Sequence, residues 1–398
     1  MSDTSVIIPT YNREAYIAQA IEGILRQTEP VREILVIDDG STDATPQIVQ
    51  KYGGIVRYCR KENSGKASSL NLAIPMTDGA NIWIFDDDDI AAPTAHRALQ
   101  NALNSERGHG FAFGRYLHFD RSDQSGIPVE TFPLPYHERL EFQSIFIQLM
   151  ERCFVFQPGM LVRRATYDKI GPFDEGLARS QDYEMLLRIA HRFSGAETSD
   201  VVFYQRRHSG QRGPATATSR FQDRESVWQS YDQRFFREWY KTLPLSAYKP
   251  SMISADERTE AHEITCLFQR LVLMGRKSLW KLAVSDLEYA LELSREIKKC
   301  ELSLEESRIL RKLFIERPFS HLQENTCGIL EMLKAEPNRS LGPEIRKNLI
   351  WAFPFYLNHF LRQADIRSAA KTVYSATNFA GSRAILSVVG ARVGRKPA

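Results

Sequence analysis

The chain has 398 residues, of which 43% are hydrophobic and 25% are charged. This length and composition predict a globular protein of two or three domains. The 52 basic and 49 acidic residues give a net charge of +3, which offers no reason to expect a nucleic acid as partner. The 5 cysteines are odd in number and form no CxxC pair, so we expect neither a disulfide scaffold nor a zinc ribbon.

The sequence also lacks the patterns of secreted and membrane-spanning proteins. A signal peptide would begin with a charged segment followed by a long apolar region, whereas residues 5–8 show the pattern of a short apolar strand. No stretch approaches the roughly 20 apolar residues that span a bilayer. The nearest candidate, 349–361, contains Pro354, Asn358 and His359, and it predicts a buried or interfacial helix. We therefore expect a cytoplasmic protein.

Strand and helix patterns alternate over the first hundred residues. The strands are continuously apolar, and such strands alternating with helices predict a parallel sheet covered on both faces. Ligands of these sheets bind beyond the carboxyl ends of the strands. The predicted strands are 6–8, 33–37, 55–58 and 81–85, and the predicted helices are 16–25, one that ends near residue 52, 67–73 and 96–103.

The pattern changes twice further along the chain. Residues 111–163 read as strand and loop, and a helix at 182–193 precedes a strand at 201–205. The segment 209–219 is rich in Gly, Ser, Thr and Ala and predicts a loop at a domain edge. Beyond it, long amphipathic segments predict helices only. The fold class is therefore an α/β domain over residues 1–218, followed by an all-α domain over 219–398.

Four consecutive carboxylates, Asp86–Asp89, follow the fourth predicted strand. They repel one another unless a cation offsets their charge, and divalent ions that prefer oxygen ligands do so. At a strand end, a diphosphate could share such an ion. The run fits equally well a solvated acidic turn that caps the helix begun near Pro93.

Three other loops carry groups that suit a nucleotide. Asp38 ends the second strand and could accept hydrogen bonds from a uracil edge or a ribose hydroxyl, although 38–43 also reads as a turn with a helix cap. The segment 9–13 lies where the first strand meets the first helix, and helix N-termini attract anions. Lys66 offers one cation after a flexible turn, in a position where lysines are usually solvated.

Two single residues have a catalytic and an ordinary interpretation. Asp182 begins a helix, where an acidic residue is usually a cap, and it could instead be a general base. His208 follows two arginines after a strand. It could be a metal or phosphate ligand, or a structural histidine.

The order of these segments along the chain is more specific than any one of them. The segments are VIIPTYN at 6–12, VIDDGSTD at 36–43, NSGK at 63–66, FDDDD at 85–89, QDYE at 181–184 and RH at 207–208. In this order they closely resemble glycosyltransferase family 2, over about residues 4–215. The resemblance implies a GT-A fold, which is an α/β (Rossmann-like) nucleotide-binding core.

The resemblance also implies a role for each matching residue. It implies a nucleoside pocket lined by Pro9, Thr10, Tyr11 and Asn12, with Asp38 at the base, Lys66 near the diphosphate, Asp86 or Asp87 at the ribose, Asp88 and His208 at a Mn²⁺ or Mg²⁺ ion, and Asp182 as catalytic base. Asp89 leaves the register of the acidic motif open by one position. Gln181 departs from the family, in which Glu often precedes the base.

The implied reaction is inverting transfer of a sugar, either a hexose or an N-acetylhexosamine, from a nucleotide-sugar donor, and the resemblance favours a UDP-sugar. The acceptor would be a glycan or a lipid-linked saccharide, as in polysaccharide and cell-envelope biosynthesis. Two alternatives remain open at this point. One is a nucleotidyltransferase, although such enzymes usually have a glycine-rich basic loop after the first strand, where this chain has the segment 9–12. The other is an interaction protein that keeps a degenerate transferase domain.

The end of the chain suggests a further partner. Residues 366–398 hold six basic residues and no acidic one, with apolar residues between them. Such a tail could contact the inner face of an anionic membrane as a peripheral anchor. A solvated or helix-packing tail is the more common reading of such a sequence. The helical half could also form a homo-oligomer or bind the acceptor.

Overall fold

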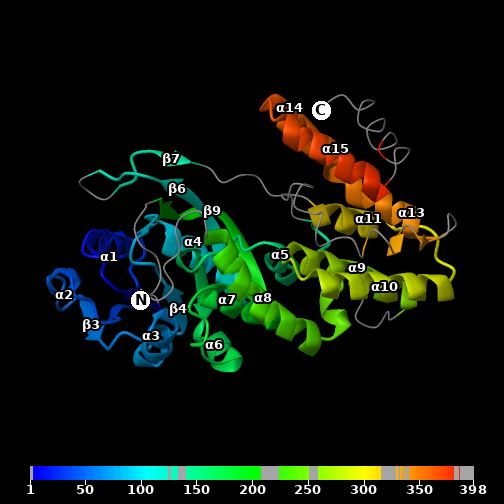
Figure 1. Ribbon diagram of the computed structural model, residues 1–398. Helices are drawn as coiled ribbons and strands as arrows, with labels where there is room; N and C mark the ends of the chain where they lie inside the picture. The colour runs from blue at the N-terminus through cyan, green and yellow to red at the C-terminus, as the bar shows by residue number, and fades with distance from the viewer. Residues whose placement is uncertain are drawn as a thin grey trace. The chain divides into compact units, whose positions relative to one another are not determined.

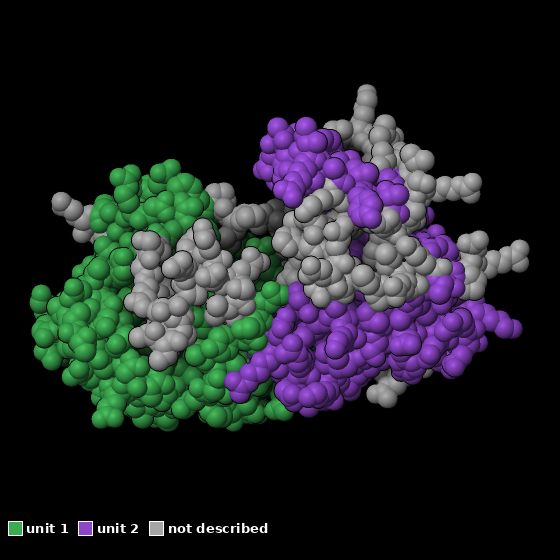
Figure 2. Space-filling view, viewed as in Figure 1, with its two compact units in different colours: residues 1–140, 145–232 green, residues 141–144, 233–398 purple. Residues whose placement is uncertain are grey.

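The computed structural model describes residues 3–123, 127–132, 140–207, 224–250, 259–314 and 340–380, together with 329, 332, 333, 335, 336 and 385. The chain divides into two compact units (Figure 2). Unit 1 comprises 1–140 and 145–232, and unit 2 comprises 141–144 and 233–398. Among the described residues, no helix is both long enough and apolar enough to cross a bilayer.

Unit 1 is built on one mixed sheet with the strand order β3-β2-β1-β4-β8-β6-β9-β5, and β7 pairs with β6 at the side (Figure 1). The first four strands are parallel to one another, as the alternating pattern predicts. These four strands are β1 (Thr4–Thr10), β2 (Glu33–Asp38), β3 (Val56–Arg60) and β4 (Asn81–Ile84).

The rest of the sheet, which the alternating pattern did not cover, is not parallel throughout. Strand β8 runs antiparallel to both β4 and β6, while β6 and β9 are parallel to each other. An antiparallel neighbour needs no helical crossover, so the strict strand–helix alternation of the first half is lost here. The strands concerned are β5 (Ile90–Ala91), β6 (His109–Phe119), β7 (Thr131–Phe132), β8 (Met160–Arg163) and β9 (Ser194–Arg206).

Helices cover the sheet and bury one apolar side each. In α1, Ile17, Ile21 and Ile24 recur at helical spacing and are at most 1% exposed. They join a core that also contains Trp83 and Leu99. The elements of this layer are α1 (Ile17–Leu25), α2 (Thr45–Gln50), α3 (Lys66–Ala73), η1 (Ile74–Met76), α4 (Ala95–Asn104), α5 (Ile145–Glu151), η2 (Gln157–Gly159), α6 (Arg164–Ile170) and α7 (Gln181–Arg192).

Every described element from residue 233 onward is helical, which confirms the all-α prediction for this part of the chain. Helices α9 and α10 pack along each other and bury Leu267, Leu271 and Leu287. The elements of this half are α8 (Arg224–Thr242), η5 (Leu245–Tyr248), α9 (Glu260–Arg276), α10 (Trp280–Glu296), α11 (Leu304–Arg311), η6 (Lys312–Phe314), α13 (Gly342–Leu349), η8 (Ile350–Ala352), α14 (Phe353–Arg362) and α15 (Ile366–Ala380).

The predicted domain edge at 209–219 falls outside the described residues. Helix α8, which follows that segment, carries its first residues in unit 1 and the remainder in unit 2.

Candidate active site

The carboxyl ends of β1, β2 and β4 lie next to one another at one edge of the sheet. Thr10 pairs with Asp38 in the parallel register, and the Phe85 amide donates to the Ile7 carbonyl at 2.9 Å. The loops that follow these strands therefore begin side by side. The sheet thus brings together the predicted segments 9–13, 38–43 and 86–89.

The first two of these loops are tied to each other through Asn12. Its backbone is left-handed, with φ of 53°, a conformation that asparagine tolerates better than most residues. The Asn12 amide donates to Ser41 Oγ at 2.9 Å, and Asn12 Oδ1 accepts from the Thr42 amide at 2.8 Å. Tyr11, which precedes Asn12, remains 36% exposed at this edge.

Asp38 faces the interior rather than the open edge. It is fully buried, and its two oxygens accept from the Ser41 amide at 2.8 Å and from the Tyr58 hydroxyl at 2.5 Å. Burial and this carboxylate raise the pKa of Tyr58. Asp38 thus holds the turn after β2, and its contact with a base stays a prediction.

Asp39 organises the loop before Lys66, a role that the sequence did not suggest. Its carboxylate accepts from Lys61 Nζ at 2.6 Å, from the Ser64 amide at 2.9 Å and from the Gly65 amide at 2.8 Å. Amides of a turn offered to a carboxylate are strong, charge-assisted donors. Asp39 therefore fixes the start of α3, from which Lys66 reaches the site.

Lys66 connects two carboxylates that lie far apart in sequence. Its Nζ is 2.5 Å from Asp86 Oδ1. Burial on its own would lower the pKa of Lys66, but the charges of Asp86 and Asp182 outweigh that effect and raise it. The structure thus brings three predicted site residues into one electrostatic cluster, which we call the Lys66 cluster: Lys66, Asp86 and Asp182.

Asp182 enters this cluster from the first turn of α7. The preceding Ser180 is left-handed, with φ of 60°, and its carbonyl accepts from the Glu184 amide at 2.8 Å. Burial raises the pKa of Asp182, Lys66 opposes the rise, and Asp86 adds to it. A carboxylate with a raised pKa accepts a proton more readily, as a general base must.

Arg13 lies against the next two carboxylates of the acidic run. Its Nε is 3.3 Å from Asp87 Oδ1, and its Nη2 is 3.9 Å from Asp88 Oδ2. Burial and the neighbouring Asp88 raise the pKa of Asp87 to about 7, although Arg13 lowers it. Two carboxylates forced together in this way form an environment that favours an additional cation.

Asp89 serves the fold, because Arg206 at the end of β9 engages it. The Arg206 amide donates to Asp89 Oδ1 at 2.9 Å, and the Arg206 guanidinium donates to the Asp88 carbonyl at 2.9 Å. The guanidinium also stacks on Tyr16 and Phe119, at 5.0 and 4.4 Å from the ring centroids. One oxygen of Asp89 is thereby occupied by the backbone of β9, and the register of the acidic motif stays a prediction.

A divalent cation fits the donor chemistry of this edge. Asp87 and Asp88 offer oxygen ligands, which Mg²⁺ and Mn²⁺ accept, and their mutual repulsion would fall on binding. Within the described ranges, no group of three or more His, Cys, Asp or Glu side chains has the arrangement of a metal site. His208, the other predicted ligand, lies outside the described residues.

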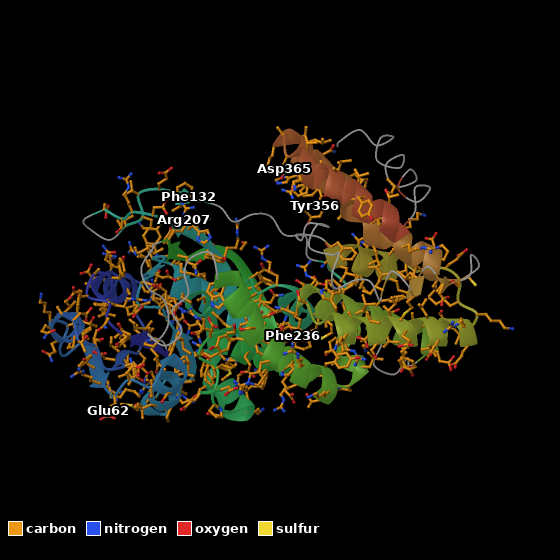
Figure 3. All side chains as sticks on the ribbon, viewed as in Figure 1. Glu62, Phe132, Arg207, Phe236, Tyr356 and Asp365 are labelled. Atoms are coloured by element: carbon orange, nitrogen blue, oxygen red, sulfur yellow. The ribbon has the colours of Figure 1, made fainter. Side chains whose placement is uncertain are left out.

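The chain that leads to His208 is anchored at Arg207. This side chain pairs with Asp120 at 2.6 Å and covers the Phe132 ring at 4.3 Å, and Figure 3 shows Arg207 and Phe132 together at the β6–β7 end.

Asp39 and Arg206 are the site residues that sequence reasoning missed. The adjacent NSG turn is the one sequence signal that could have pointed to Asp39.

Comparisons with known proteins show which sequences this chain resembles. The sequence profile described as Glycosyl transferase family 2 matches residues 5–171. An uncharacterized glycosyltransferase of Rickettsia prowazekii is 29% identical over 237 residues, which are 59% of this chain and 73% of that protein. The glycosyltransferase GlyG of Streptococcus pneumoniae is 34% identical over 123 residues, 30% of this chain and 40% of that protein.

Two solved structures are similar in outline. One is S. aureus TarS 1–349 in complex with UDP-GlcNAc, with a TM-score of 0.48 and 18% identity, covering 94% of this chain and 91% of that chain. The other is the mannosyltransferase PcManGT of Pyrobaculum calidifontis with GDP-Man and Mn²⁺, with a TM-score of 0.45 and 16% identity, covering 84% and 88%.

The sequence matches cover the part of the chain that forms the site. The family profile spans the loops after β1, β2 and β4, and the relative from R. prowazekii is also a glycosyltransferase. The predicted fold class is confirmed as an α/β sheet domain followed by helices. Residues 5–171, which carry the loops of the site, are thus similar to glycosyl transferase family 2, and a helical region follows them in the chain.

Proposed function

We propose that the protein transfers a hexosyl or N-acetylhexosaminyl group from a UDP-sugar to a hydroxyl group of a glycan or lipid-linked saccharide, with inversion. The observation that carries this proposal is the Lys66 cluster. It joins a carboxylate suited to proton abstraction with the acidic loop suited to a diphosphate. UDP is the nucleotide that the resemblance of the segment 36–43 implies.

Asp182 is the proposed general base. It takes the proton of the acceptor hydroxyl while that oxygen forms a bond to the anomeric carbon. The bond from this carbon to the diphosphate oxygen breaks on the opposite face, and the nucleoside diphosphate leaves with the electron pair. General bases contribute about 10²–10⁴-fold to rate.

The donor half of the site is assigned to the loops after β1, β2 and β4. The 9–12 segment, with its exposed Tyr11, would line the nucleoside pocket, with Asp86 at the ribose and Lys66 near the diphosphate. Asp87 and Asp88 would hold Mn²⁺ or Mg²⁺, which when bound neutralises charge on the leaving diphosphate. His208 remains a proposed ligand to the same ion.

Calorimetric titration of the full chain with UDP, with and without Mn²⁺, tests the proposal together with release of UDP from UDP-glucose and UDP-GlcNAc. We expect UDP binding that strengthens with Mn²⁺ and release of UDP from at least one sugar. Incubation with UTP and a sugar phosphate is the counter-test. Formation of a UDP-sugar in that reaction, without release of UDP from either donor, would make the protein a nucleotidyltransferase.

A further inference from the structure

A glutamine side chain near the site is buried without hydrogen bonds. Gln157 is 4% exposed, and among the described residues neither its Nε2 nor its Oε1 has a partner. A buried amide normally forms several hydrogen bonds, because its separation from water is otherwise uncompensated. The donor and acceptor groups of this amide are therefore available to form hydrogen bonds with a bound molecule.

Gln27, in the same unit, shows the ordinary arrangement. It is 5% exposed, its Nε2 donates to the carbonyls of Gly23 and Ala92 at 3.0 and 2.8 Å, and its Oε1 accepts from the His96 amide at 2.9 Å. The bonds to Ala92 and His96 tie the segment after α1 to the start of α4, and the bond to Gly23 ties that segment back to α1. The contrast shows that burial of an amide in unit 1 does not by itself leave it unpaired.

Gln157 lies at the edge of the sheet that carries the acidic run. It begins η2, directly before β8, and β8 is antiparallel to β4. The Trp83 indole in β4 donates to the Pro158 carbonyl at 2.8 Å. Because an antiparallel neighbour starts where its partner ends, η2 lies beside the end of β4 from which Asp86–Asp88 follow.

A second contact places the same segment there. Phe156 packs edge-on against Tyr116, with ring centroids 5.1 Å apart. Burial is the main cause that raises the pKa of Tyr116, and the charge of Asp89 contributes to the rise. The chain just before Gln157 is therefore close to the acidic run as well.

The start of α7 shows the same feature. Gln181 Oε1 is buried and has no partner within the part of the chain that the structure describes, and Gln181 directly precedes Asp182. Two amide side chains, one beside the end of β4 and one next to Asp182 in the chain, thus have buried atoms without hydrogen-bond partners among the described residues.

We propose that Gln157 binds the sugar ring of the donor through the hydroxyl groups of that ring. An amide offers two N–H donors and one carbonyl acceptor in a fixed plane, and a pair of neighbouring ring hydroxyls can both accept and donate. The inference rests on the proposed function and deepens it, because it assigns Gln157 to recognition of the sugar rather than of the nucleotide. A site built in this way discriminates against donors that lack the matching hydroxyl.

The substitution Gln157→Met tests this assignment, since it removes both polar atoms while keeping nearly the same shape. We expect a melting temperature equal to or above that of the wild type, because an unpaired buried amide is replaced by an apolar side chain. We expect the Kd for UDP with Mn²⁺ to stay within about twofold. The kcat/KM for release of UDP from UDP-glucose or UDP-GlcNAc should fall at least about tenfold.

Gln27→Met is the matched control, because it removes an amide whose bonds are all made. It should lower the melting temperature and leave kcat/KM of the folded protein unchanged. If Gln157→Met does not fold, Gln157→Asn serves instead, because its side chain keeps the amide but is one methylene shorter. The same loss of kcat/KM is expected.

The outcomes separate the two proposals. A Gln157→Met protein that loses stability as Gln27→Met does, while its kcat/KM is unchanged, overturns the assignment and makes Gln157 structural. A wild-type protein that neither binds UDP nor releases it from either donor overturns the proposed function, and the sugar assignment falls with it.

Discussion

Asp182 has two charged neighbours of opposite sign, and its pKa reflects both as well as its burial. Burial raises this pKa, Lys66 opposes the rise, and Asp86 adds to it. The Asp182 Oδ1 also accepts from the Tyr183 amide at 2.9 Å, a bond that an asparagine side chain can keep. The carboxylate can therefore be neutralised without disturbing the first turn of α7.

We expect Asp182→Asn to fold, to bind UDP and to release UDP from its donor about 10²–10⁴-fold more slowly, because the proposed base is lost. Steady-state rates of UDP release measure this. Glu184→Gln is the control on the same helix, since Glu184 pairs with Arg188 at 2.7 Å instead of joining the Lys66 cluster. Its kcat should be unchanged, and a normal kcat in Asp182→Asn would remove Asp182 from the reaction.

Lys66→Met should shift the pH dependence of transfer. Lys66 lowers the pKa of Asp182, so its removal raises that pKa further. Because the proposed base works when deprotonated, the acidic limb of the kcat/KM profile should move to higher pH. Lys66→Arg keeps the charge and should leave the limb near its original position. An unmoved limb in Lys66→Met would show that this limb belongs to another group.

Residues whose chemistry follows a motif could be predicted from sequence, and residues that act through burial could not. Lys66, Asp86 and Asp182 stand in recognisable segments, and the structure brings them together. Asp39 and Arg206 act through backbone amides and carbonyls supplied by other loops. Gln157 stands out only because its amide is buried without partners, and a sequence does not show burial of a single side chain.

At the scale of elements, the first residue of β2 ties three segments together. Glu33 accepts from Ser5 Oγ at 2.7 Å, from the Asp78 amide at 2.7 Å and from Arg57 at 2.8 Å. Burial works against these bonds, and on balance the pKa of Glu33 is lowered. This carboxylate therefore links β1, β3 and the loop before β4 at the amino edge of the sheet.

Glu33→Gln should cost about 1 kcal/mol at pH 7, a value kept small because the site is partly open to solvent. A lowered folded-state pKa stabilises above the unfolded-state value, about 4.3, and that stabilisation is lost as pH falls through the folded-state pKa. Urea unfolding at pH 7 and pH 3 checks this. The difference between wild type and variant should shrink at pH 3, and a constant difference would contradict the ionic origin.

Elements with a strong local pattern could be predicted, and their pairing could not. The apolar runs of β1, β2 and β4 and the spacing of Ile17, Ile21 and Ile24 in α1 are visible in the sequence. The antiparallel insertion of β8 between β4 and β6 depends on contacts between distant segments. No local propensity encodes which strand becomes the neighbour of which.

At the scale of the whole molecule, the last described helices carry apolar side chains on their surface. Phe355 and Leu361 in α14 are 61% and 55% exposed, and Ile366 and Tyr374 in α15 are 74% and 62% exposed. The sequence predicted helices here but not their function. Amphipathic spacing indicates which face is apolar, and it does not identify what covers that face.

The basic tail and this exposed face lead to a test of membrane contact. Residues 381–398 contain Arg383, Arg392, Arg395 and Lys396. Each basic residue near an anionic surface contributes about 1 kcal/mol, so removal of 381–398 should weaken binding to phosphatidylglycerol vesicles at least about tenfold. Vesicle co-sedimentation measures this, with phosphatidylcholine vesicles as control. Equal binding by the full and shortened chains would dismiss the membrane as partner of the tail.

The bonds from Arg206 to Asp88 and Asp89 bear on how this enzyme could be re-engineered. They fasten the last residue of β9 to the acidic loop, so the segment after β9 starts from a point fixed by that loop. A chimera that exchanges this segment with a relative should therefore be joined after residue 206, with Asp89 kept from the same parent. Grafts joined before residue 206 would separate a matched pair and shift the acidic loop even when every acidic side chain is retained.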